Sequence, residues 1–111
     1  MNKKQLRKWI DALYSGKYKQ DTFVLQSDIG YCCLGVACEV LIPKTKLKIE
    51  NGLMAGYLPN EQPNAPKWLK QINNHFRKKL GTDLTHLNDE KGFSFEEIGM
   101  ILELVYINKA L

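Results

Sequence analysis

The stretch GYCCLGVACEVL, residues 30–41, places two adjacent cysteines at the start of an apolar segment and a third five residues later. Its apolar side chains recur with helical spacing and Pro43 follows, so we predict a helix over residues 32–42. The apolar face consists of Cys33, Val36, Ala37, Val40 and Leu41. Thiols placed in this way can serve as a nucleophile at a helix N-terminus, as metal ligands or as core residues. The choice among these decides whether the protein is an enzyme.

Helical spacing separates the three thiols. Cys33 shares the apolar face and Cys38 lies one turn beyond Leu34, so both are predicted to pack in the core. Cys32 lies on the side of Gly35 and closest to the free N–H groups of the helix, whose positive potential lowers a thiol pKa. We therefore expect Cys32 to be the most accessible cysteine. The cysteines lack the C-x-x-C spacing of a zinc site, so neither a metal nor another cofactor is expected.

A cysteine-dependent hydrolase or transferase also needs a base and a group that orients it. The histidines are His75 and His86, and the second lies in a loop-like stretch, THLNDEKGFS, beside Asp89. Cys32, His86 and Asp89 have the residue types of nucleophile, base and orienter. No family-specific catalytic sequence surrounds Cys32. A non-catalytic protein is therefore the main expectation, and this triad is the alternative.

Three further helices are predicted around the opening stretch. Residues 3–14 carry apolar side chains at i, i+3, i+4 and i+7 and so form an amphipathic helix. A second segment ends at Leu80, with Gly81 in the position of a C-terminal glycine. The last helix begins at Ser94, which forms a capping box with Glu97. Each of these helices has one apolar face, which indicates a shared core.

Two segments have β character. The apolar run FVL, residues 23–25, lies between turn residues and predicts a strand. The dipeptide Asn51-Gly52 separates two apolar runs, the pattern of a type I′ hairpin. We therefore predict an α+β fold in a single domain over residues 1–111, with about four helices and a short antiparallel sheet or hairpin.

Composition and charge narrow the class of protein. No apolar run approaches the roughly 20 residues of a membrane span, and no signal-peptide core is present, so we expect a cytoplasmic protein without a membrane partner. Three cysteines are an odd number, which favours reduced thiols. Residues 1–80 carry 14 basic and 6 acidic side chains, a net +8, whereas residues 81–111 carry 2 and 6, a net −4. This basic body suits an anionic partner, but no nucleic-acid-binding motif accompanies it.

Four stretches carry a resemblance to a known family: WIDALYSGKYKQ, YCCLGVACEV, the short YLP, and LNDEKGFSFEEIGMILE. With them the chain resembles a family of small proteins from bacteriophage and prophage genomes. The resemblance covers less than half of the chain, with the stretches in the same order. It implies a phage accessory protein that acts in the cytoplasm of the host bacterium. Gly99 departs from the pattern, since alanine would suit a helix better there.

Several polar residues of these stretches lie at helix ends or in loops, where binding groups are common. A helix N-terminus and a lysine suit a phosphate, tyrosine faces suit a base, and an Asn-Asp pair suits a ribose. The candidate ligand-binding residues are Lys17, Tyr18, Gln20, Tyr31, Cys32, Cys33, Asn88 and Asp89. The structural alternative is that Asn88 and Asp89 cap a turn, the tyrosines cover the core and Gln20 binds backbone.

Three functions are compatible with these residues. The leading hypothesis is a non-catalytic sponge that binds a small anionic, nucleotide-derived ligand and thereby counteracts host immune signalling. A homo-oligomer would help so short a chain to enclose a ligand. The second hypothesis is the hydrolase or transferase that uses Cys32. The third is a protein that binds a host protein or nucleic acid through the basic face of residues 3–14.

Overall fold

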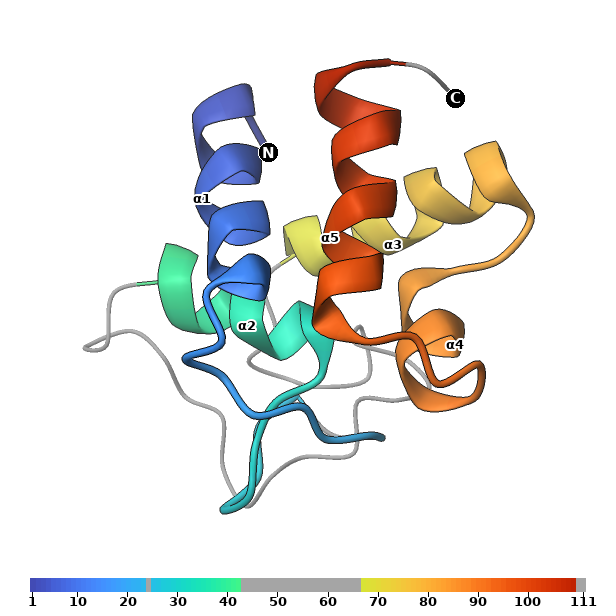
Figure 1. Cartoon of the computed structure of the whole chain (residues 1–111). Coiled ribbons are helices and arrows are strands. Elements are labelled where there is room, and N and C mark those ends of the chain that lie inside the picture. The colour runs from blue at the N-terminus through green and yellow to red at the C-terminus, as the bar shows by residue number, and fades with distance from the viewer. Residues whose placement is uncertain (24, 43–66, 110–111) are drawn as a thin grey trace.

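The computed structural model describes residues 1–23, 25–42 and 67–109. Five α-helices and a terminal π-helix account for most of these residues. They are α1 (Lys3–Tyr14), α2 (Cys33–Leu41), α3 (Lys67–Leu80), α4 (Leu84–Asp89), α5 (Phe95–Leu102) and η3 (Glu103–Ile107). Helix α5 continues directly into η3, and α1 lies beside this column and packs across α2 (Figure 1). Helix α4 packs against α2, α3 and α5, so the helices enclose one core.

Helix α1 has the bounds that the sequence predicts. Asn2 and Gln5 form a reciprocal capping box, in which each side chain accepts the other's backbone N–H at 2.9 and 2.8 Å. The buried face is Leu6, Trp9, Ile10 and Leu13, as the apolar spacing indicates. The indole Nε1 of Trp9 donates to the carbonyl of Cys33 at 2.9 Å. Helix α1 is thereby joined to the first turn of α2 inside the core.

Helix α2 is the centre of the fold. Every residue from Cys33 to Cys38 is buried, so this helix is covered on all sides. Gly35 lets the preceding segment pass directly over the helix, because a Cβ there would lie 1.6 Å from the carbonyl oxygen of Leu25. Leu25 itself is only 1% exposed. The apolar stretch 30–41 therefore forms a buried helix, and the segment of chain that precedes the helix covers one of its sides.

The predicted α+β class is wrong, because the structure is mostly helical and contains no sheet within residues 1–23, 25–42 and 67–109. The sequence predicts a strand at residues 23–25. Among the described residues, the loop before α2 instead makes isolated β-bridges, from Gln20 and from Gln26 to Tyr31. Phe23 has a φ of 64°, which interrupts extended backbone, and its N–H donates to a carboxylate oxygen of Asp89 at 2.9 Å. The predicted hairpin at residues 51–52 lies outside the described residues.

The C-terminal part holds one helix more than predicted. The stretch interpreted as a loop contains α4, which begins behind Asp83, whose carboxylate accepts the N–H of His86 at 2.9 Å. The predicted C-terminal glycine of α3, Gly81, has a φ of 78°. The capping box of Ser94 and Glu97 is confirmed, with hydrogen bonds of 3.0 and 3.1 Å. A short, polar helix such as α4 has little apolar periodicity for sequence analysis to detect.

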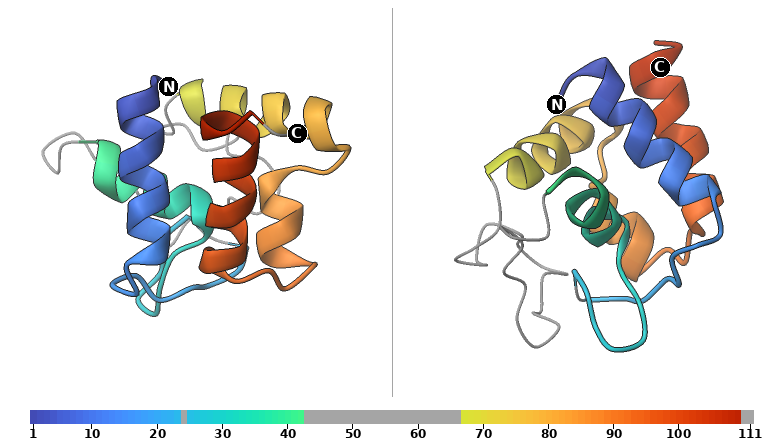
Figure 2. Two further views of the ribbon diagram at one scale, coloured as in Figure 1. Left: turned by 45° about the horizontal axis from the view of Figure 1, so that its top comes forward. Right: turned by 90° about the vertical axis from the view of Figure 1, so that its left-hand side faces the viewer.

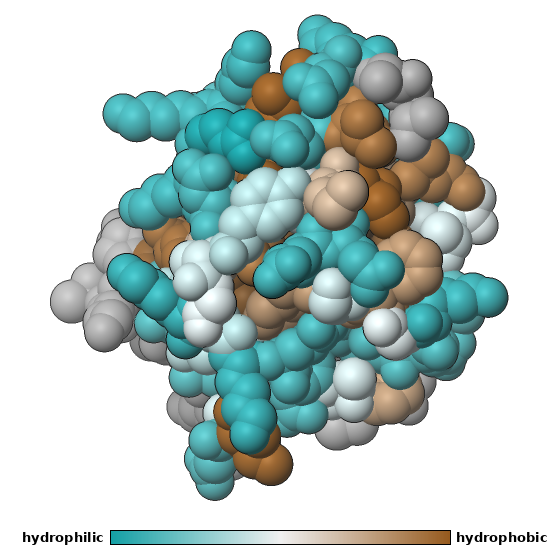
Figure 3. All heavy atoms as spheres, in the orientation of Figure 1, coloured by the Kyte–Doolittle hydropathy of each residue, from teal (hydrophilic) through white to brown (hydrophobic). Residues whose placement is uncertain are grey.

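The face seen in Figure 3 is mostly hydrophilic, with apolar side chains gathered over the α5–η3 column. Among these helices Met100 is 56% and Leu104 is 39% exposed. Among the described residues, none of the helices has the length and apolar character that crossing a membrane requires.

Candidate functional site

The predicted residues Gln20, Cys33, Asn88 and Asp89 meet in one buried cluster, which we call the Asn88 network. The Asn88 amide is 1% exposed. Its Oδ1 accepts from Gln20 Nε2 at 2.8 Å and from the backbone N–H of Cys33 at 3.2 Å. Its Nδ2 donates to the carbonyl of Asp21 at 2.9 Å and to Asp89 Oδ1 at 2.8 Å. Both atoms of the amide are occupied within the protein, so Asn88 joins α4 to α2 and to the loop before it.

The other members of the Asn88 network are also held internally. Gln20 Nε2 donates to the carbonyl of Phe93 at 2.8 Å, the backbone bond that the structural alternative expected. Asp89 Oδ1 accepts from Phe23 and Asn88, whereas its buried Oδ2 has no hydrogen-bond partner in the described structure. Burial raises the pKa of Asp89, and the two hydrogen bonds oppose this effect. This geometry favours a structural role for Gln20 and Asn88.

Cys32, which the sequence predicts to be the most accessible thiol, is buried, as are Cys33 and Cys38. Cys32 caps α2, where its Sγ accepts the N–H of Gly35 at 3.4 Å, and it is only 1% exposed. Burial raises the pKa of both Cys32 and Cys38 to about 12 and raises that of Cys33 as well. The backbone of Leu25 lies against Gly35, on the side of α2 where the sequence predicts Cys32 to be exposed. All three thiols are therefore protonated and shielded, as in a structural core.

The candidate triad is not assembled. The Nδ1 atom of His86 lies 2.8 Å from a carboxylate oxygen of Glu90, one turn further along. The bonded oxygen of Asp89 is occupied by Phe23 and Asn88. Since Cys32 is a protonated cap of α2, the three side chains do not form a nucleophile, base and orienter.

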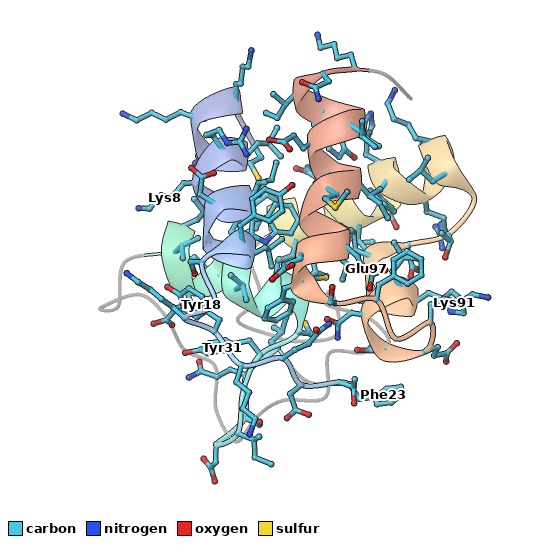
Figure 4. All side chains as sticks on the ribbon, viewed as in Figure 1. Lys8, Tyr18, Phe23, Tyr31, Lys91 and Glu97 are labelled. Atoms are coloured by element: carbon cyan, nitrogen blue, oxygen red, sulfur yellow. The ribbon has the colours of Figure 1, made fainter. Side chains whose placement is uncertain are left out.

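Three predicted residues remain at the surface. Lys17 is exposed, and Tyr18 and Tyr31 are partly buried, with their rings in an edge-to-face pair at a centroid distance of 5.4 Å. Both tyrosines lie in the segment between α1 and α2, residues 15–32, which we call the loop layer and which lies below α1 in Figure 4. The tyrosine pair covers the core, again in agreement with the structural alternative.

A different group of side chains lines a cavity of about 320 Å³, which we call the α1–α3 cavity. Its lining comes from the start of the chain, from α1, from α3 and from η3: Met1, Leu6, Trp68, Gln71, Ile72, His75 and Tyr106. The starts of α1 and α3 lie close together in the left view of Figure 2. Sequence analysis missed this site, although Trp68, Gln71 and His75 recur at i, i+3 and i+7 beside the apolar face of α3.

His75 and Tyr106 form a pair at this cavity. Their rings lie 5.5 Å apart at 34°, and the phenol oxygen lies 2.9 Å from His75 Nδ1. Burial raises the pKa of Tyr106 to about 12, so the phenol keeps its proton at neutral pH. In the tautomer whose Nδ1 accepts from this phenol, the ring proton of His75 lies on Nε2. The cavity wall therefore combines aromatic faces with a hydrogen-bonding imidazole.

A family model described as Domain of unknown function (DUF8296) matches residues 1–106. The chain belongs to the DUF8296 family. No curated protein and no solved structure matches it. The DUF8296 match contains the whole Asn88 network and every residue of the α1–α3 cavity, including Tyr106 at its end.

A metal site and a basic helix face are two further classes of site to which the DUF8296 chain can be compared. Among the residues that the structure describes, His, Cys, Asp and Glu side chains form no group of three that could hold a metal ion. The basic face of α1 is partly neutralised, because Arg7 pairs with Glu103 at 2.8 Å and with Asp11 at 3.1 Å. Paired arginine is less available for phosphate contacts than the sequence of α1 suggests.

Proposed function

We propose that the chain is a non-catalytic phage accessory protein that sequesters a small anionic, nucleotide-derived ligand and so counteracts immune signalling in the host cell. The observation that carries the binding function is the α1–α3 cavity. Its volume falls in the range of small-molecule sites, and its apolar and aromatic lining with a few polar groups has the usual character of such sites. The cavity is lined by one chain, so the proposed binding requires no second copy.

The charge of the helices that line the cavity supports an anionic ligand. Helix α3 carries five basic and no acidic side chains. Helix α1 carries four basic side chains and one acidic one, Asp11. An excess of basic side chains on these helices attracts an anion and speeds its association. The assignment to a phage rests on the resemblance of the four sequence stretches described above.

The cysteine chemistry argues against the enzymatic alternative. A thiol attacks as the thiolate, and a pKa of about 12 for Cys32 leaves almost none of it at neutral pH. A protein that binds without turnover needs no such group. It instead needs high affinity, because each copy removes a single signal molecule. Dissociation constants in the nanomolar range, about −12 kcal/mol, are the required scale.

Thermal unfolding tests this proposal with the four ribonucleoside monophosphates and their cyclic dinucleotides as probes. A ligand at 100 times its dissociation constant should stabilise the fold by about 2.7 kcal/mol and raise Tm by several degrees. The bound molecule should be recovered chemically unchanged after heat denaturation. A Tm unaffected by every probe would refute the binding function, and recovery of a cleaved molecule would refute its non-catalytic character.

A further inference from the structure

We propose that the α1–α3 cavity holds a purine ring, which stacks on its aromatic wall and is recognised at its hydrogen-bonding edge by Gln71. This inference rests on the proposed function and specifies the ligand class and the subsite. It assigns roles to Trp68, Gln71 and His75, none of which belongs to the Asn88 network or to the tyrosine pair of the loop layer.

The wall of the cavity suits a flat ring. Trp68 is half-buried against the core and contributes its remaining surface to the cavity. Tyr106 and His75 add two tilted rings held together by a hydrogen bond. Leu6 and Ile72 supply a buried aliphatic surface between α1 and α3. Aromatic side chains in a partly apolar site bind nucleobases by stacking, which depends on the face of the ring rather than on its charge.

The polar groups of the cavity match the edge of a purine. Gln71 is exposed and lines the cavity, and its amide makes no hydrogen bond with another described residue. A glutamine amide can donate to N7 and accept from the N6 amino group of adenine at the same time. His75 lies one turn away on α3, and in the tautomer whose Nδ1 accepts from the Tyr106 phenol its Nε2–H offers a second donor. An adenine ring thus finds both a donor and an acceptor.

The surroundings of the cavity suit the phosphate of the same ligand. Exposed lysines occupy the first turns of both helices that begin at the cavity: Lys3 and Lys4 on α1, and Lys67 and Lys70 on α3. Lys67 and Lys70 directly precede the lining residues Trp68 and Gln71 in the sequence. A nucleotide whose base enters the cavity would therefore carry its phosphate toward a positive surface.

Calorimetric titration with AMP tests the subsite. We expect Gln71→Leu to weaken AMP binding by about tenfold or more through loss of the paired hydrogen bonds. Trp68→Leu should weaken it by a similar factor through loss of stacking. Gln26→Leu is the matched control, because Gln26 lies near Tyr31, outside the cavity, and should bind AMP like the wild type. Gln71 is exposed, so its variant should keep the helical circular dichroism of the parent.

Two further probes identify which part of the ligand is recognised and where it comes from. Ribose 5-phosphate, which has a phosphate but no base, should bind at least tenfold more weakly than AMP. A single-stranded adenosine oligonucleotide should also bind more weakly, since the inference is for a free nucleotide. Equal or tighter binding of either probe would overturn the inference.

The two proposals fail in different ways. If AMP binds the wild type and folded Gln71→Leu and Trp68→Leu equally well, the cavity assignment is wrong while the binding function stands. If Tyr18→Ala alone abolishes AMP binding, the site lies at the tyrosine pair of the loop layer instead. If neither AMP nor any other nucleotide of the panel binds the wild type, both proposals are overturned.

Discussion

Replacing Gly35 with alanine tests the close contact between α2 and the loop that crosses it. In an ordinary helix interior this change stabilises by about 1 kcal/mol, because alanine has the higher helix propensity. Here the new Cβ would lie 1.6 Å from the carbonyl oxygen of Leu25 and 2.6 Å from its carbonyl carbon. Real Cβ atoms essentially never approach other atoms within 3.0 Å, so two backbones must separate.

The cost follows from what must move. Leu25 is 1% exposed, and lifting its backbone off α2 withdraws its side chain from the core. Removal of a buried leucine side chain costs roughly 2–5 kcal/mol. After the gain in helix propensity, we expect Gly35→Ala to lower the free energy of unfolding by roughly 1–4 kcal/mol. Urea unfolding followed by circular dichroism at 222 nm measures this difference directly.

Gly99→Ala is the control, since it makes the same change in another buried helical glycine. Its Cβ would lie 2.8 Å from the ring of Tyr14, a partly buried side chain that can shift more easily than backbone. We expect the two opposing effects to leave its stability within roughly 1 kcal/mol of the wild type. A Gly35→Ala protein as stable as the wild type, or less destabilised than Gly99→Ala, would refute the argument.

Three other predictions concern the core. Asn88→Ala should lower the free energy of unfolding in urea by roughly 3 kcal/mol, because four hydrogen bonds are lost and their buried partner groups are left unpaired. A decrease below about 1 kcal/mol would contradict this. Burial raises the pKa of Asp89 above its ordinary 3.8. The contribution of Asp89 to the stability of the wild type therefore falls as pH rises from that ordinary value through the raised pKa. Asp89→Asn should therefore gain stability relative to the wild type as pH rises above about 4, and a constant difference would argue against it. Iodoacetamide at pH 7 should label Cys32, Cys33 and Cys38 only after unfolding, and labelling of Cys32 in the folded protein would contradict this.

The parts of the fold that sequence analysis predicted are local. The bounds of α1 follow from apolar spacing, and the start of α5 follows from the capping box of Ser94 and Glu97. The burial of Cys33 and Cys38 follows from their places on α2. In each case the deciding residues lie within about one turn of one another, so that chain spacing is a sufficient guide.

The errors arose where distant segments meet. The run at residues 23–25 has strand composition, but the contact of Leu25 with Gly35 and the bond from Phe23 to Asp89 fix a different backbone. Cys32 would be exposed on α2 alone, and in the fold it is buried at the point where the Leu25 backbone passes close to Gly35. The α1–α3 cavity combines residues from Met1 to Tyr106, and no spacing along the chain relates them.

The buried thiols give the protein a practical property. Because the three native cysteines are shielded, a cysteine introduced at an exposed position would be the preferred point of attachment for a fluorescent dye. Lys70→Cys would place such a reporter on α3 next to Gln71, and Lys91→Cys would place one in the loop after α4. Both reporters could be attached without first removing native cysteines, a removal that would leave holes around α2.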